Sequence, residues 1–184
     1  GEMKFERMVE ELKKAKHYIF LEYFIIEEGI MWDTILDILE QKVQEGVEVR
    51  VMYDDIGCIN TLPNRYDAKL RRMGIKCCVF NPFHAKLNAL FNNRDHRKIL
   101  VIDGCVAFTG GINLADEYIN AYPKHGHWKD ASILVKGDAV WSFTIMFLTA
   151  WNLTTGDTCM YEEYEPHRYF DEEFENDGYV IPYA

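Results

Sequence analysis

Hydrophobic and polar positions along the first eighty residues follow two different periods, which predict helices and strands in alternation. Apolar residues recur every three or four positions in three segments, as expected for amphipathic helices. Between them lie short segments rich in β-branched and aromatic residues, which are typical of buried strands. The expected helices are 2–16, 30–44 and 66–73, and the expected strands are 17–26, 47–53 and 75–80. This order predicts an α/β fold.

The second half of the chain predicts further strands that run in both directions. An unbroken apolar run, residues 99–102, is followed by Asp103 and Gly104, a strong hairpin signal, so residues 105–108 can return as a strand. Residues 128–135 and 138–151 predict another strand and a helix. The fold class we expect is therefore α/β, with a mixed, largely parallel sheet flanked by helices on both faces.

Candidate chemistry gathers at the start of the hairpin. Side chains alternate along a strand, so His96 and Lys98 are expected to share one face. Beyond the return strand come Gly110, Gly111 and Asn113, which offer close backbone approach, free N–H groups and an amide donor. An imidazole nucleophile, a cation and nearby donors suit attack on a phosphodiester without a metal or cofactor. The plainer interpretation is a solvated strand edge.

The spacing of these residues resembles the signature of the phospholipase D superfamily. His96-x-Lys98-x4-Asp103 is followed by Gly110-Gly111-x-Asn113, and the flanking residues resemble the first catalytic half of bacterial cardiolipin synthases. The resemblance implies that His96, Lys98 and Asp103 are catalytic. It also implies that Lys98, Gly110, Gly111 and Asn113 bind the substrate phosphate.

Two acidic residues near the motif have less certain roles in this interpretation. Asp103 precedes the turn glycine, a position that favours a structural role with its carboxylate bound by nearby donors. The resembled family carries an acidic residue in the strand after the glycine loop, where it orients a catalytic imidazole. Asp130 fits that position. Whether it serves His96 or a histidine from a second half stays open.

The resembled enzymes usually carry two such signatures in one active site, and this chain contains one. We expect residues 1–152 to form the phospholipase D-like catalytic domain and residues 153–184 to form an acidic linker that enters a second domain. Residues 153–184 hold nine acidic residues and one arginine, so the net charge of −10 leaves only −2 for the rest. That balance speaks against a nucleic-acid partner, because such proteins present a basic surface.

Other polar residues near the expected strands have open roles. Glu22 interrupts the apolar strand 17–26, so it needs either a partner on a neighbouring strand or a place near the active site. Asp54 and Asp55 end a strand, where carboxylates cap a loop or helix more often than they catalyse. His125 and His127 lie in a loop and are expected to be exposed. The apolar loop 83–91, which contains His84, is either packed on the core or dips into lipid.

The cysteines and the apolar runs bear on disulfide bonds, metal sites and membrane-spanning segments. Five cysteines form no C-x-x-C pair, which favours free thiols, and no metal-ligand spacing occurs. No run of eighteen apolar residues exists, so we expect no membrane-spanning segment in this chain, with the full-length protein at the cell membrane.

The function that we expect is phosphatidyl transfer from one phosphatidylglycerol to another at a membrane surface. The resemblance implies a phosphatidyl-histidine intermediate and a second phospholipase D-like domain of the same full-length chain. The alternative is a phosphodiesterase, acting on lipid or nucleic acid, with water as acceptor. A retained fold that only binds partners is disfavoured by the intact His96, Lys98 and Asn113.

Overall fold

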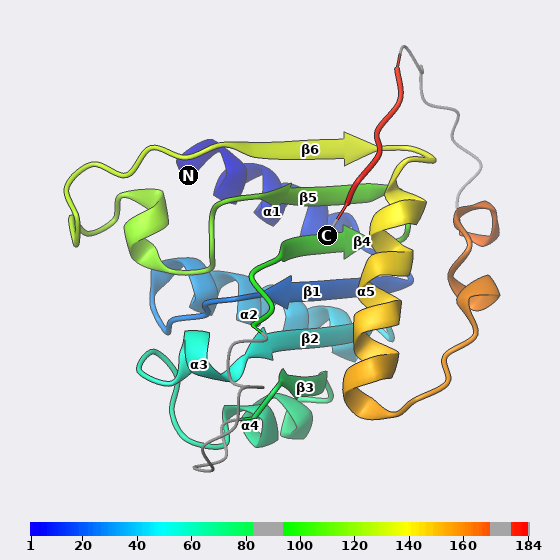
Figure 1. The fold of residues 1–184 in the computed structure, drawn as a ribbon, viewed down its shortest axis with the longest axis horizontal. Coiled ribbons are helices and arrows are strands. Elements are labelled where there is room, and N and C mark those ends of the chain that lie inside the picture. The colour runs from blue at the N-terminus through cyan, green and yellow to red at the C-terminus, as the bar shows by residue number, and fades with distance from the viewer. Residues whose placement is uncertain (83–93, 170–177, 184) are drawn as a thin grey trace.

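Six strands form one mixed sheet with helices on both faces in the computed structural model, which describes residues 1–82, 94–169 and 178–183 (Figure 1). The strands are β1 (Tyr18–Tyr23), β2 (Glu48–Asp54), β3 (Lys76–Phe80), β4 (Lys98–Ile102), β5 (Val106–Gly110) and β6 (Ser132–Lys136). The helices are α1 (Glu2–Lys14), α2 (Ile30–Gln44), α3 (Asp55–Cys58), α4 (Tyr66–Arg72) and α5 (Val140–Thr155), with 3-10 turns at Asp116–Ile119, Tyr161–Tyr164 and Pro166–Arg168.

The strand order is β3-β2-β1-β4-β5-β6, and the direction of pairing changes at β1. β1, β2 and β3 pair in parallel, because helices connect them. β4 is antiparallel to β1, and the β4–β5 and β5–β6 pairs are also antiparallel. The mixed sheet is therefore confirmed. The largely parallel character holds for the β1–β3 half, whereas the half that follows the hairpin is antiparallel.

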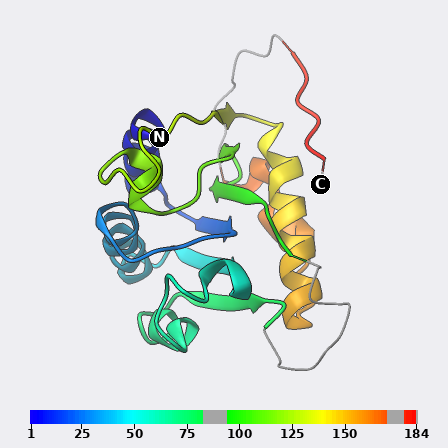
Figure 2. The ribbon, with the colours of Figure 1, turned by 60° about the vertical axis from the view of Figure 1, so that its left-hand side comes forward.

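Each face of the sheet packs against its own helical layer. α1, α2 and α4 cover one face, and α5, with the 3-10 turn at Tyr161–Tyr164, covers the other (Figures 1 and 2). Strand β1 shows the division clearly, because Ile19 and Leu21 face the first layer while Tyr18 and Phe20 face α5. Every residue of β1 is buried, so alternation of polarity could not reveal its two faces.

The predicted hairpin turn is present between β4 and β5. Asp103 and Gly104 have positive φ values of 50° and 68°, as in a type I′ turn, and the Cys105 N–H donates to the Ile102 carbonyl at 3.1 Å to close it. The sequence missed the short helix α3. Its N-cap is Asp54, whose Oδ1 accepts a hydrogen bond from the Gly57 N–H at 3.0 Å, so the capping role expected for a strand-end carboxylate is confirmed.

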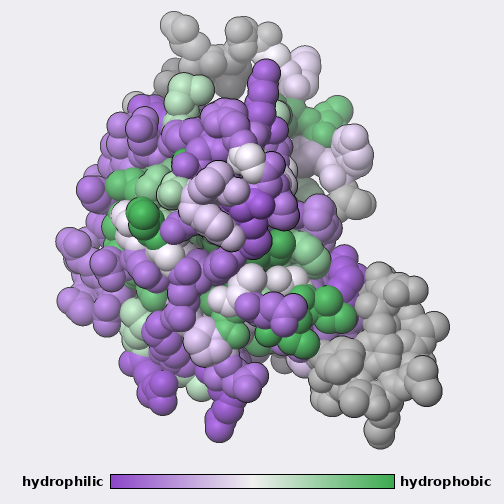
Figure 3. Space-filling model, turned by 90° about the vertical axis from the view of Figure 1, so that its left-hand side faces the viewer, coloured by the Kyte–Doolittle hydropathy of each residue, from purple (hydrophilic) through white to green (hydrophobic). Residues whose placement is uncertain are grey.

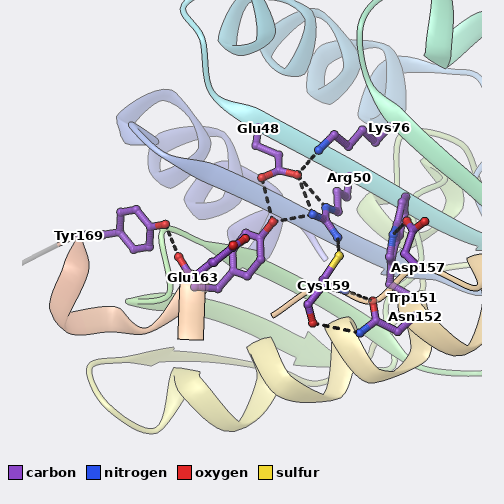
Figure 4. Close-up of polar contacts among 10 residues, drawn as sticks. Glu48, Arg50, Lys76, Trp151, Asn152, Asp157, Cys159, Glu163 and Tyr169 are labelled. Atoms are coloured by element: carbon purple, nitrogen blue, oxygen red, sulfur yellow. Dashed lines mark hydrogen bonds and ion pairs between the residues drawn. The ribbon is translucent and has the colours of Figure 1, made fainter. Parts of the chain in front are cut away.

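The acidic C-terminal stretch begins as part of the packed domain. Helix α5 ends at Thr155, and Gly156 with φ 78° is its C-cap. Beyond it, Tyr164 is buried and its hydroxyl accepts from the Arg50 guanidinium. Arg50 also donates to Cys159 Sγ at 2.9 Å (Figure 4) and lies over the Trp151 ring. These contacts fasten residues 159–164 to β2, and the acidic linker expected over residues 153–184 stays a prediction.

Candidate functional site

The motif histidine and lysine lie together at one edge of the sheet, where β1 and β2 end and β4 begins (Figure 1). His96 is exposed in the segment before β4, whereas Lys98 opens the strand and is only 3% exposed. The imidazole centroid is 4.8 Å from the Phe24 ring centroid, and Lys98 Nζ is 5.3 Å from the same centroid. Lys98 Nζ also donates to the carbonyl oxygen of His96. The two side chains therefore share one site, as the strand alternation predicts.

Partial burial shifts the pKa of both groups in the direction that favours reaction with a phosphate. Partial burial and the positive charge of Lys98 lower the pKa of His96 below its usual value, so the imidazole is largely neutral at neutral pH. Burial also lowers the pKa of Lys98 to about 8, against the raising effects of Asp95 and Asp130. A neutral imidazole nitrogen is nucleophilic, and a poorly solvated ammonium gains strongly from an anionic ligand.

Carboxylates of β1 and β2 contact the segment that carries His96. Asp54 Oδ2 accepts from the backbone N–H of Asp95 at 3.1 Å, and Asp54 Oδ1 accepts from Arg94 at 3.3 Å. Glu22 of β1 lies 2.7 Å from Arg97 Nε. The charged neighbour of Glu22 is therefore Arg97, which precedes β4 and is not on a neighbouring strand, and the carboxyl group lies next to the segment that carries His96.

The glycine loop contacts the rest of the protein more than was expected. The Gly111 N–H donates to the Ala131 carbonyl at 3.2 Å, so the expectation of two free glycine N–H groups is wrong for Gly111. Gly110 has φ 140°, and a Cβ there would lie 2.4 Å from the Ala131 oxygen, which explains the glycine. β5 pairs with β6 at this point, and Gly110 lines a cavity that His96 and Lys98 also line.

Asn113 is also engaged internally. Its Oδ1 accepts from the Ile25 N–H at 3.0 Å and its Nδ2 donates to the Tyr118 hydroxyl at 2.9 Å. The residue is 3% exposed. Asn113 thus ties the β1 end to the loop after β5, and its assignment as a phosphate donor stays a prediction.

Asp130 and an unforeseen lysine complete the edge. Asp130 is exposed and accepts from Trp128 Nε1 at 3.3 Å and from the Ala131 N–H at 2.7 Å. Its charge acts on Lys98 and on Lys4 of α1. Lys4 is 6% exposed and donates to the Ile112 carbonyl at 3.1 Å. Helical spacing could have revealed Lys4, because it falls on the buried stripe of α1.

Asp103 lies at the opposite end of β4 from His96. Its two carboxylate oxygens accept from the backbone N–H groups of Lys16, His17 and Tyr18 at 2.8, 2.8 and 2.9 Å. The expected structural role is confirmed. Its inclusion among the catalytic residues is corrected, because a full strand separates it from the imidazole.

The other candidates contribute little to this edge. His125 and His127 are exposed, as expected, and loop 83–91 with His84 lies outside the described residues. Within the described ranges, no cluster of three or more His, Cys, Asp or Glu side chains could hold a metal ion. None of the described helices is long and apolar enough to cross a bilayer. Figure 3 views the molecule from the left-hand side of Figure 1, and the surface there is mostly hydrophilic with smaller hydrophobic patches.

Comparison with known proteins places these residues in a family context. The family described as "Cardiolipin synthase, PLD-like domain" matches residues 8–122. A cardiolipin synthase of Oceanobacillus iheyensis is 40% identical over 163 residues, and cardiolipin synthase 2 of Staphylococcus epidermidis is 38% identical over 172. These matches cover 89% and 92% of this chain but 34% of each relative. The chain thus spans about a third of the length of these relatives.

Solved structures with the same fold include enzymes of several kinds. Phosphatidylserine synthase of Haemophilus influenzae aligns over 90% of this chain and 40% of its own, with TM-score 0.61 and 14% identity. Nuc of Salmonella typhimurium, described as a phospholipase D family member, aligns over 80% and 86%, with TM-score 0.56 and 16% identity. At these identities the likeness supports the fold alone.

Proposed function

Because the chain belongs to the family of phospholipase D-like domains of cardiolipin synthases, we propose that it supplies one half of a phosphatidyltransferase active site. His96 attacks the phosphorus of phosphatidylglycerol, the bond from phosphorus to the glycerol headgroup oxygen breaks, and glycerol leaves with a proton from a general acid. A hydroxyl of a second phosphatidylglycerol then attacks the phosphatidyl-histidine, transfers its proton to the same group, and releases cardiolipin and free His96.

Lys98 stabilises the phosphate throughout this sequence. Its ammonium lies with the imidazole against Phe24, so a nonbridging oxygen held by Lys98 places phosphorus near the attacking nitrogen. The low exposure of Lys98 strengthens the interaction, because little water competes for the charge. The juxtaposition of the His96 imidazole and the buried Lys98 ammonium beside Phe24 is the observation that carries the proposal.

The general acid comes from a second phospholipase D-like domain of the full-length chain. In-line displacement needs that acid on the far side of phosphorus, because the His96 nitrogen is occupied by the new bond. Asp130 is exposed at the same edge, so it is available to orient an imidazole contributed by the second domain. Phosphatidylglycerol would be taken from a membrane surface.

Product analysis of the full-length protein tests this function. We expect vesicles of phosphatidylglycerol to yield cardiolipin and glycerol in equal amounts, with both products lost in His96→Ala. Phosphatidic acid as the main lipid product would instead identify water as the acceptor and a phosphodiesterase. A His96→Ala protein that retains cardiolipin formation would contradict the assignment of the nucleophile.

Anion binding to the isolated chain gives a simpler prediction for Lys98. Sulfate should bind beside His96 and Lys98, and affinity should fall as pH rises through about 8, because Lys98 then loses its charge. Lys98→Met should weaken binding about tenfold or more, the size of one charge-assisted contact. Titration calorimetry measures the effect, and Lys129→Met, which removes an exposed lysine near the same edge, is the matched control. Equal affinity in the two variants would remove Lys98 from the site.

A further inference from the structure

A buried carboxyl group outside the proposed mechanism lies directly under the histidine segment. Glu22 is 1% exposed, and on the α5 face of the sheet it sits in register between Met52 of β2 and Ile99 of β4. Among the described residues, no donor makes a hydrogen bond to either of its carboxyl oxygens. An ionised carboxylate in such a place costs several kcal/mol unless its charge is compensated.

The groups that approach Glu22 are the two neighbours of His96 in the chain. Arg97 Nε is 2.7 Å from Glu22 Oε1 and 2.9 Å from Asp95 Oδ1. Nε carries a single proton, and its hydrogen bond goes to Asp95, which also accepts the Arg97 backbone N–H at 3.1 Å. One guanidinium thus joins two carboxyl groups, and the Glu22 oxygens lack a hydrogen-bonding proton.

A proton shared between the carboxyl groups of Glu22 and Asp95 would remove the repulsion between their charges. Two carboxylates in contact cannot both ionise cheaply, so one of them keeps its proton. Burial and contact with Asp95 raise the pKa of Glu22 well above its usual value, whereas hydrogen bonds from Glu22 and Arg97 lower that of Asp95. The proton therefore belongs on Glu22, which donates it to Asp95.

The surrounding elements reinforce this protonation. Helix α5, which covers this face, contains no charged residue. β2 contributes Asp54, another negative charge, which accepts from the Asp95 N–H. The titratable and charged groups near Glu22 are Asp54 and Arg50 of β2, Cys78 of β3, and Asp95 and Arg97 before β4.

We propose that Glu22 is a positioning residue for His96. Its protonated carboxyl donates to Asp95, and this acid pair, together with Arg97, fixes the residue before and the residue after the imidazole. When Glu22 loses its proton, a second negative charge meets Asp95 and the fixed geometry is lost. The proposal rests on the proposed function, since it concerns the presentation of His96 to a phosphate.

The first test is a direct titration of Glu22 in the chain of 184 residues. With carbon-13-labelled carboxyl groups, we expect one glutamate signal to titrate well above the usual range and to vanish in Glu22→Gln. In Asp95→Asn that titration should move back toward the usual range, because the neighbouring charge is gone. A Glu22 signal with an ordinary pKa would overturn the proposal. The Asp95→Asn result keeps the test decisive should Glu22→Gln fail to fold.

The second test links Glu22 to the site. Sulfate binding is measured through the NMR ring signals of His96. In the wild-type chain the affinity for sulfate should fall about tenfold as pH rises through the titration of Glu22. A tenfold change corresponds to a coupling of about one pKa unit between Glu22 and the bound sulfate. Lys98 adds its own loss near pH 8 in every variant. Glu22→Gln keeps a neutral donor to Asp95 at every pH, so it should retain only the Lys98 loss. Identical pH profiles for the two proteins would show that Glu22 does not position the site.

The two tests of Glu22 can fail or succeed independently of the proposed transferase function. Both tests use the chain alone with sulfate and need no lipid or second domain. A full-length protein that fails to make cardiolipin would overturn the transferase and leave the Glu22 results standing. Conversely, cardiolipin synthesis with an unchanged pH profile in Glu22→Gln would overturn only the positioning role.

Discussion

The chain alone is expected to turn over a phosphodiester about 10²–10⁴-fold more slowly than the full-length protein, because its sequence holds no second H-x-K signature to supply a group that protonates the leaving oxygen. His96 cannot serve both purposes, since its attacking nitrogen is consumed in the bond to phosphorus. Of the other histidines whose side chains the structure describes, His17 precedes β1 at the end of that strand opposite to the site, and His125 and His127 are exposed in the loop between the 3-10 turn at 116–119 and β6.

The measurement is hydrolysis of a small chromogenic phosphodiester at several protein concentrations, with His96→Ala as the blank. Residual turnover that grows faster than protein concentration would indicate that two copies of the chain place their His96 side chains face to face. Substantial His96-dependent turnover that is first order in protein, from a species shown to be monomeric, would mean that one half forms a complete site.

The second large effect concerns stability. Asp103→Ala should lower the free energy of unfolding by about 3–5 kcal/mol, because three backbone N–H groups at the start of β1 lose a charged acceptor and alanine must adopt φ 50°. Chemical denaturation of the chain monitors this loss through tryptophan fluorescence, as Trp32 is fully buried.

Two further variants separate the causes. Asp103→Gly removes the carboxylate but relieves the backbone, so it should lose about 1 kcal/mol less than Asp103→Ala. Asp103→Asn keeps an oxygen acceptor and tolerates the left-handed backbone, so it should lose least. If all three variants unfold like the wild type, the carboxylate does not hold the β1 start and its structural role is wrong.

Local pattern was enough to locate most of the secondary structure. Helix Ile30–Gln44 was predicted at its observed bounds, because its buried residues recur with helical spacing and Gly46 follows. The hairpin at Asp103 and Gly104 was also predictable, since few residues tolerate positive φ at both positions. The shared face of His96 and Lys98 followed from strand alternation. Each of these features depends on residues close together in the chain.

The tertiary structure decided which of the polar residues are available to a ligand. Asn113 and Gly111 look like free donors in the sequence, but they bind Tyr118, Ile25 and Ala131 once β5, β6 and the end of β1 are assembled. Their availability depends on neighbours that no local spacing specifies.

The same reason applies to Glu22. The sequence by itself determined that a carboxylate interrupts a buried strand and therefore needs compensation. Only the pairing of β1 with β4 decided that the compensating groups are Asp95 and Arg97, on either side of His96. Strand register brings together charges that lie far apart in the chain, and burial then makes their interaction strong enough to set which group keeps a proton.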